Sequence, residues 1–139
     1  MITSFTVEYR FLSNFFFCPI RIDEFLFPSV ENAYQASKTL PMEGAMFEDI
    51  PPGQAKRLGG KVVLRPDWDE VKLGIMEDLL RIKFSNPRLL AELLSMGDEE
   101  LIEGNDWGDR FWGAEFIGEK WVGENHLGKL LMQIRGEKR

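Results

Sequence analysis

The chain has 139 residues and a net charge of −6, and 44% of its residues are hydrophobic. This length predicts one domain whose core is large enough to fold without disulfides or metals. The single cysteine, Cys18, excludes an internal disulfide and favours an intracellular, cytoplasmic protein, while the acidic balance argues against a general nucleic-acid binder.

The N-terminal region is predicted to form a small antiparallel sheet. Polar and apolar residues alternate over residues 5–11, which is the period of a strand. Ile20–Ile22 and Phe25–Phe27 are predicted to be a second extended pair that turns at Asp23 and Glu24. We expect neither a signal peptide nor a membrane segment, because no basic leader precedes an apolar stretch and no apolar run could span a bilayer.

From Ser29 onward the sequence signals are helical. Ser29 is a good N-cap, Pro52 suits a first helical turn, and Asn125 is expected to cap the last helix. Residues 101–123 place large aromatic side chains among glycines and acids, which is typical of a loop with a hairpin. Helices are predicted over residues 29–40, 43–49, 52–58, 67–84, 87–96 and 125–135.

The first of these helices begins with groups that can do chemistry. Glu31 lies in its first turn, where the positive end of the helix dipole stabilises a carboxylate. Gln35 and Lys38 follow at spacings of four and three residues, so the three side chains can share one face. Nearby aromatic residues such as Tyr34 can exclude water from the carboxylate and tune its pKa. The same pattern also fits a solvated helix face, so both interpretations stay open at this point.

The types of residue in the sequence limit the reactions that the protein could catalyse. One histidine and one cysteine cannot assemble the usual zinc site, and no phosphate-binding glycine loop, dinucleotide fingerprint or nucleophile elbow occurs. We therefore expect no metal and no cofactor, and we interpret His126 as a packing or surface residue. What remains is carboxylate chemistry supported by amides, lysines and aromatic walls. Such a set suits cleavage of a glycosidic bond through a transition state of oxocarbenium character.

Five ordered blocks of the sequence resemble the YbiA-like family, also called the NADAR domain family. The blocks lie at residues 11–15, 28–38, 68–84, 101–113 and 123–132. The resemblance implies a compact, mainly helical α+β domain over residues 1–139. It also implies an N-glycosidase that hydrolyses the bond between a base-like amine and ribose phosphate. The best known substrates of the family are reactive ribosylamino pyrimidine intermediates of riboflavin biosynthesis.

The resemblance further implies which residues form the site. Glu31 would be the catalytic carboxylate, Asp109 its acidic partner, and Trp68 the platform on which the base stacks. Other pocket residues would supply charge for a phosphate and amides for sugar hydroxyls. These are Asn14, Gln35, Lys38, Lys72, Trp112 and Asn125.

Several of these assignments have alternatives. Glu103 and Asp106 precede Asp109 at spacings of three, and either could be the acid that faces Glu31. The two tryptophans also fit a core, Lys72 fits a solvated helix face, and Asn125 fits a cap alone. The chain departs from the family pattern after Gly113, where it has Ala114-Glu115 in place of a second nearby glycine, which alters the rim of the pocket.

Two other functions stay open from the sequence. One is removal of ADP-ribose from modified guanine in nucleic acid, which needs a basic track near the pocket. The other is a module that binds NAD-derived or ADP-ribosyl ligands without cleaving them. The expected partner is a small ribosyl phosphate, with nucleic acid only as a modified substrate and no membrane.

Overall fold

Helices dominate the fold, and two short antiparallel sheets complete it. The computed structural model describes residues 1–139, and the chain divides into two compact units. The central unit is Asn14–Ser85, and the terminal unit combines Met1–Ser13 with Asn86–Arg139. The expected α+β, mainly helical class is confirmed. None of the helices has both the length and the apolar composition needed to cross a membrane.

The central unit begins with the predicted hairpin. β1 (Ile20–Ile22) pairs antiparallel with β2 (Phe25–Phe27), in a register that sets Ile20 opposite Phe27. At the turn, Asp23 adopts the left-handed conformation with φ of 52°, which aspartate tolerates better than most residues. Ile20 and Phe27 are fully buried, so one face of the hairpin belongs to the core. The small N-terminal sheet is therefore confirmed.

The first helix is shorter than predicted. α1 (Val30–Ala36) begins after Ser29, whose side chain accepts a hydrogen bond from the Asn32 amide as an N-cap does. It stops before residue 40 because Ser37 and Thr39 turn their hydroxyls back onto main-chain carbonyls of the last turn. Pro41 follows, and a proline disfavours helical geometry at the residue before it.

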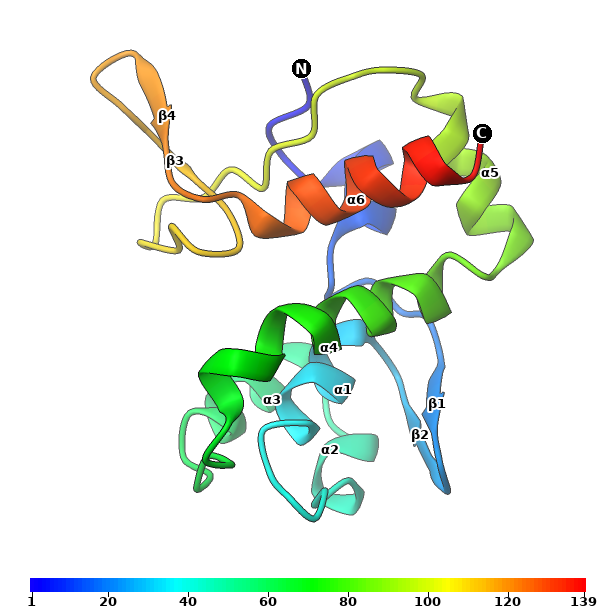
Figure 1. Cartoon of the computed structure of the whole chain (residues 1–139), viewed down its shortest axis with the longest axis vertical. Coiled ribbons are helices and arrows are strands. Elements are labelled where there is room, and N and C mark those ends of the chain that lie inside the picture. Colours follow the sequence, from blue (N-terminus) through cyan, green and yellow to red (C-terminus); the bar gives the residue numbers. More distant parts are fainter. The chain divides into compact units, whose positions relative to one another are not determined.

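Three other helices of the central unit pack around α1 (Figure 1). They are α2 (Ala45–Glu48), α3 (Pro52–Gly59) and α4 (Trp68–Lys83). α3 approaches α1 closely at Gly59, where an added Cβ would lie 1.8 Å from Oε1 of Gln35. The three helices were predicted, and Gly59 is the last residue of α3. Its absent side chain also makes the contact between α3 and α1 possible.

In the terminal unit, the predicted strand over residues 5–11 is wrong. Val7–Leu12 forms a 3-10 helix, η1, and Val7 has φ of 54°, which breaks any extended run. Alternating side chains do not make a strand unless a partner takes up the backbone N–H and C=O groups, and no strand pairs with this segment. The extended residue that does pair is Ile2, which bonds to the main chain of Glu100 and Ile102.

The rest of the terminal unit follows the predicted order. α5 (Pro87–Ser95), capped by Asn86, packs against α6 (His126–Glu137). β3 (Glu115–Ile117) and β4 (Lys120–Val122) form the hairpin expected within residues 101–123, and Figure 1 shows it as a narrow ribbon ahead of α6.

Candidate functional site

A buried carboxylate and a buried amide meet on α1. Oε1 of Glu31 accepts a 2.8 Å hydrogen bond from Nε2 of Gln35, one helical turn later. The two residues are only 7% and 4% exposed. The predicted shared face of Glu31 and Gln35 is therefore present, and it does not face bulk solvent. Electrostatic interactions of this carboxylate are stronger than they would be in water.

The scaffold fixes α1 on both sides of Glu31. The Glu31 main-chain amide donates to the Asn14 carbonyl at 3.0 Å. The next side chain, Asn32, is fully buried and donates to the carbonyls of Phe47 and Ile50, both at 2.9 Å. Asn32 thus ties α1 to the region of α2. No local sequence pattern predicts this role, because the partners of Asn32 lie 15 and 18 residues further along the chain.

Asn14 places an acceptor in the same unit. Its Nδ2 lies 3.5 Å from the sulfur of Met76, and the residue is 8% exposed. Oδ1 of Asn14 and Oε1 of Gln35 are both buried, and neither has a hydrogen-bond partner. Buried polar atoms normally have a partner. A role of Asn14 in binding substrate stays a prediction.

Two lysines of the central unit act electrostatically on a third, Lys38. Lys38, just after α1, is half-buried, and its Nζ lies 3.5 Å from the Gly59 carbonyl and 5.9 Å from the Tyr34 ring centre. Burial lowers the pKa of Lys38, the charge of Glu31 opposes that shift, and Lys56 and Lys72 lower the pKa further. The predicted Lys38 and Lys72 are thus near enough to interact. Lys56, on α3, was not predicted.

Trp68 opens α4 and packs on an aromatic neighbour. Its ring centre lies 5.1 Å from that of Tyr34, with the planes tilted by 56°. Trp68 is 6% exposed, so much of its surface is already used in packing. The contact joins α4 to the helix that carries Glu31. A stacking role toward a base stays a prediction.

The other predicted acid, Asp109, belongs to the terminal unit. Its Oδ1 accepts hydrogen bonds from the main-chain amides of Phe111 and Trp112, at 3.2 and 2.9 Å. The Asn105 side chain bonds to both the amide and the carbonyl of Asp109. The loop therefore fixes the carboxylate through local contacts. Its pairing with Glu31 stays a prediction, as does the alternative pairing with Glu103 or Asp106.

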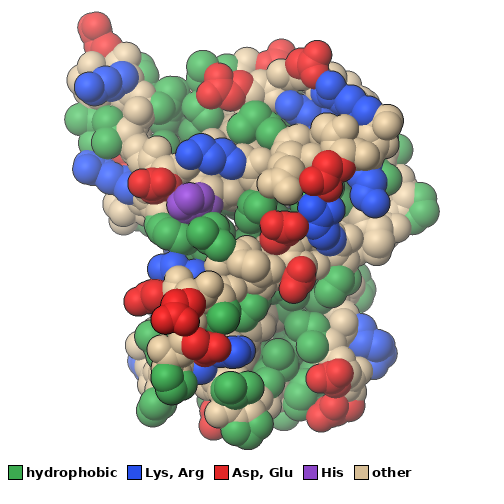
Figure 2. All heavy atoms as spheres, in the orientation of Figure 1, with side chains coloured by type: hydrophobic (Ala, Val, Ile, Leu, Met, Phe, Trp, Pro, Cys, Tyr) green, Lys and Arg blue, Asp and Glu red, His purple; other side chains and the backbone are tan.

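Trp112 lies in an aromatic group of the terminal unit. Its ring meets that of Phe111 edge-on at 4.8 Å, and the His126 ring lies 4.5 Å from Phe111. Nε2 of His126 is 3.5 Å from a Glu124 carboxylate oxygen. Figure 2 shows the histidine, in purple, at the surface beside an acidic side chain. These contacts agree with the packing or surface role expected for His126.

Asn125 is the N-cap residue of α6, as predicted, but its side chain does not do the work of a cap. The residue has φ of 51°, and its side chain makes no cap hydrogen bond. Its Nδ2 donates to the Leu101 carbonyl at 2.9 Å, and its Oδ1 accepts from the Glu103 amide at 3.0 Å. The amide thus joins the start of α6 to a distant segment. Whether it also contacts substrate stays a prediction.

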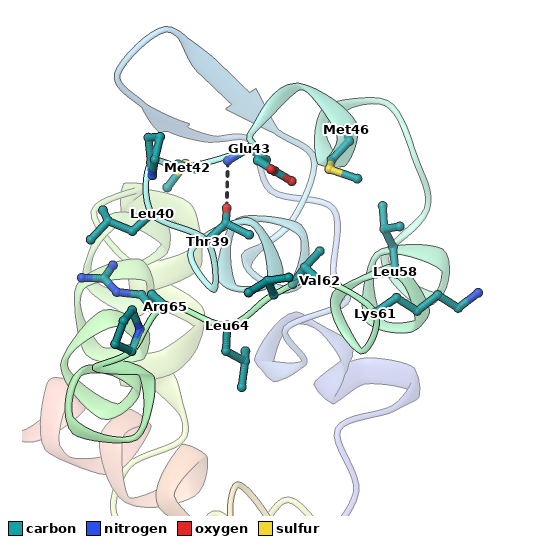
Figure 3. A pocket seen from close by; sticks show the side chains of 13 residues that line it. Thr39, Leu40, Met42, Glu43, Met46, Leu58, Lys61, Val62, Leu64 and Arg65 are labelled. Carbon is teal, nitrogen blue, oxygen red and sulfur yellow. Dashed lines mark hydrogen bonds between the residues drawn. The ribbon is translucent and has the colours of Figure 1, made fainter.

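A separate hollow of about 670 Å³ lies beside the end of α1 (Figure 3). The segments around Leu40 and Val62 form two of its sides, and Met46 and Leu58 face each other at one end. A hydrogen bond from the Glu43 amide to the Thr39 hydroxyl holds one rim. None of the predicted site residues lines this hollow.

The one cysteine is also in the central unit. Cys18 is buried, and burial raises the pKa of its thiol, an effect that the charge of Lys83 partly offsets. Lys83 is 1% exposed, with Nζ 5.6 Å from the Phe16 ring centre and 5.4 Å from that of Phe84. A raised pKa keeps the thiol protonated at neutral pH and makes it a poor nucleophile.

The comparisons with known proteins agree on one family. The family model of the NADAR domain matches residues 3–139. The N-glycosidase Npun_R5314 of Nostoc punctiforme is 38% identical, over 94% of this chain and 86% of its own length. The N-glycosidase YbiA of Escherichia coli strain K12 is 35% identical, over 92% of this chain and 81% of its own length.

Two further comparisons concern a longer relative and a solved structure. The riboflavin biosynthesis protein VVA0006 of Vibrio vulnificus is 35% identical over 94% of this chain, which spans 36% of that protein. The NMR structure of E. coli YbiA superposes with a TM-score of 0.82 at 33% identity, covering 99% of this chain and 82% of that one.

Proposed function

Because this chain belongs to the NADAR domain family, we propose that it is an N-glycosidase acting on the bond between a base-like amine and ribose phosphate. We propose reactive ribosylamino pyrimidine intermediates of riboflavin biosynthesis as its substrates. Two relatives are named N-glycosidases, and a third is named a riboflavin biosynthesis protein. The observation that carries the proposal is the buried Glu31 carboxylate, held by Gln35 in the unit that also contains the interacting lysines.

The proposed chemistry centres on Glu31. As the glycosidic bond breaks, positive charge develops at the anomeric carbon, and a fixed carboxylate in a water-poor site stabilises that charge strongly. Glu31 would also hold or activate the attacking water. Gln35 would keep the carboxylate oriented through its hydrogen bond.

The other predicted residues would assist on either side of that carbon. Asp109 would stabilise charge or shuttle a proton, and Trp68 would hold the leaving base. The lysines would bind the phosphate, and the buried acceptor of Asn14 would receive a sugar hydroxyl. In this proposal no metal takes part, so a chelator should leave turnover unchanged.

The test is release of ribose 5-phosphate from freshly generated ribosylamino pyrimidines. We expect Glu31→Gln to lower turnover by at least about 10³-fold, since it removes the charge that the transition state needs, and to keep the fold. Glu70→Gln, at an exposed position of α4, is the matched control and should retain activity. Full activity in Glu31→Gln would overturn the role of Glu31. If only an ADP-ribosylated guanine oligonucleotide were cleaved, the substrate assignment would be wrong.

A further inference from the structure

A reciprocal pair of hydrogen bonds closes the start of α1 around Glu31. The Ser29 hydroxyl accepts from the Asn32 main-chain amide at 3.1 Å and donates to Oδ1 of Asn32 at 2.6 Å. A capping box closes a helix start in a similar way. Glu31 lies between the two residues, so the pair fixes the stretch of main chain that carries the carboxylate.

Asn32 connects this local pair to a distant segment. Its Nδ2 donates to the Phe47 carbonyl of α2 and to the Ile50 carbonyl just after that helix, both at 2.9 Å. The last carbonyls of a helix have no partner within it, and the Asn32 amide supplies donors at the end of α2. Ser29 is 1% exposed and Asn32 0%, so water has little access to the network. The place of α1 at Glu31 is therefore coupled to that of α2.

Other contacts hold Glu31 from different directions. Its main-chain amide donates to the Asn14 carbonyl at 3.0 Å, and Gln35 donates to its carboxylate at 2.8 Å. The bonds of Asn14 and Asn32 set where the main chain places Glu31. The bond of Gln35 sets how the side chain is turned.

The Asn32 side chain is not available to a ligand. Its amide donates to two carbonyls, and its oxygen accepts from the Ser29 hydroxyl. The side-chain oxygens of Asn14 and Gln35, by contrast, are buried without a partner. Any effect of Asn32 on the reaction must therefore act through Glu31.

We propose that Asn32 is a positioning residue, which holds the Glu31 carboxylate in place for the reaction by bonding α1 to the Phe47 and Ile50 carbonyls. This inference rests on the proposed function for the reaction that Glu31 carries out. A misplacement of about 1 Å at a reacting centre can lower a rate about 10²-fold. Loss of the network should therefore lower kcat, and KM should hold because Asn32 does not contact the substrate.

Steady-state hydrolysis of ribosylamino pyrimidines by the full chain tests the proposal. We expect Asn32→Ala to lower kcat by about 10- to 100-fold and to change KM by less than about twofold, the pattern of a lost transition-state interaction. Ser29→Ala removes the hydroxyl but leaves both bonds from Asn32 to α2 and its following residue. Its kcat should fall less, by about three- to tenfold.

Thr39→Val is the matched control at the other end of α1. The Thr39 hydroxyl donates to the Ala36 carbonyl at 3.1 Å and accepts from the Glu43 amide at 2.9 Å (Figure 3). The residue is 7% exposed, and valine keeps its shape while it removes both bonds. Tm should fall in both Asn32→Ala and Thr39→Val, but only Asn32→Ala should lose kcat. Assays well below both Tm values compare folded proteins.

Hydrogen exchange of the Glu31 amide gives a second measurement that needs no substrate. This amide donates to the Asn14 carbonyl, so its exchange rate reports whether α1 stays in place at Glu31. Asn32→Ala should speed the exchange at least about tenfold, whereas Thr39→Val should leave it near the wild-type rate.

Three results would overturn the proposal. One is wild-type kcat in a folded Asn32→Ala variant. Another is an equal loss of kcat in Thr39→Val, which would show a general loosening of α1. The third is a raised KM at unchanged kcat in Asn32→Ala, which would assign Asn32 to substrate binding. If Asn32→Ala does not fold, Ser29→Ala decides, and wild-type kcat and exchange in that variant would overturn the proposal.

The two measurements separate this proposal from the proposed function. If the wild type hydrolyses no ribosylamino pyrimidine but Asn32→Ala speeds exchange at Glu31, the proposed function fails and the positioning of Glu31 by Asn32 stands. If hydrolysis occurs and Asn32→Ala matches the wild type in both kcat and exchange, the positioning fails and the proposed function stands.

Discussion

The Gln35 amide donates a 2.8 Å hydrogen bond to the Glu31 carboxylate from the next turn of the same helix. The opposite atom of that amide, Oε1, is buried, has no hydrogen-bond partner and lies against Gly59 of α3. Gln35 is therefore confined between the carboxylate it holds and the helix behind it. The orientation of Glu31 depends on how closely α3 packs.

Loss of the Gln35 amide should impair catalysis more than stability. We expect Gln35→Met, which keeps the length of the side chain, to lower kcat by about 10- to 100-fold. This factor corresponds to the free energy that one hydrogen bond to a charged group contributes. Gln35→Glu should also lower kcat at neutral pH, because a second carboxylate raises the pKa of the pair. Steady-state rates between pH 5 and 9 measure both effects. Wild-type kcat in Gln35→Met would show that Glu31 needs no positioning.

Gly59 should tolerate no side chain. The added Cβ of Gly59→Ala would lie 1.8 Å from Oε1 and 2.6 Å from Cδ of Gln35, so α3 or Gln35 must move. We expect a loss of about 1–3 kcal/mol in the free energy of unfolding, together with lower activity. Urea unfolding measures the loss.

Gly60→Ala is the control for this substitution. Gly60 has φ of −74° and ψ of −9°, and its nearest new contact would be 3.4 Å, to the Arg57 carbonyl. Alanine fits that conformation and lowers the entropy of the unfolded chain, so stability should hold or rise by about 0.4–1 kcal/mol. Equal losses in the two variants would contradict the proposed contact between Gly59 and Gln35.

The half-buried charge of Lys38 should lower the stability of the folded protein at neutral pH, while it supports phosphate binding. Burial lowers the pKa of Lys38 in the folded state, so between that pKa and the ordinary value of 10.5 the unfolded chain holds more protons. Stability then rises with pH across this window. Lys38→Met should therefore raise Tm at pH 7, and the gain should shrink as the pH approaches 10.5.

The same substitution should weaken the substrate complex. We expect KM for a phosphorylated substrate to rise about tenfold in Lys38→Met, with a smaller change for its dephosphorylated form. Thermal melts from pH 7 to 10.5 and paired KM measurements check the two effects. A lower Tm at pH 7 would contradict the unfavourable burial of the charge.

Substitution of Asn125 should mainly lower the stability of the terminal unit. Asn125→Ala leaves the Leu101 carbonyl and the Glu103 amide without their partner and places alanine at φ of 51°. We expect a loss of about 2–4 kcal/mol, from the unpaired groups and the strained backbone. Asn125→Gly removes the strain alone and should lose less. A raised KM at unchanged stability would instead favour direct contact with substrate.

Local patterns accounted for much of the central unit. Ser29 caps α1 because its hydroxyl reaches an amide three residues away, and Gln35 meets Glu31 because residues four apart share a helical face. The turn at Asp23 follows from the two-residue gap between two extended runs. These contacts close within a few residues, so the sequence is sufficient to predict them.

Where the partner lies far along the chain, local patterns failed. The alternation over residues 5–11 predicted a strand, but no neighbouring strand exists there and η1 forms instead. Asn125 has the type and place of a cap, yet its amide bonds to Leu101 and Glu103, more than twenty residues away.

The sequence by itself determined the helices, the first hairpin, the family and the candidate carboxylate Glu31, because caps, turn residues and side-chain periods act over a few residues. Only the tertiary structure decided that Gly59 lies against Gln35, that Asn32 bonds α1 to the region of α2, and that Lys56 and Lys72 act electrostatically on Lys38. These relationships arise where helices pack, because the helix axes and their closest approach are set by every side chain in the contact.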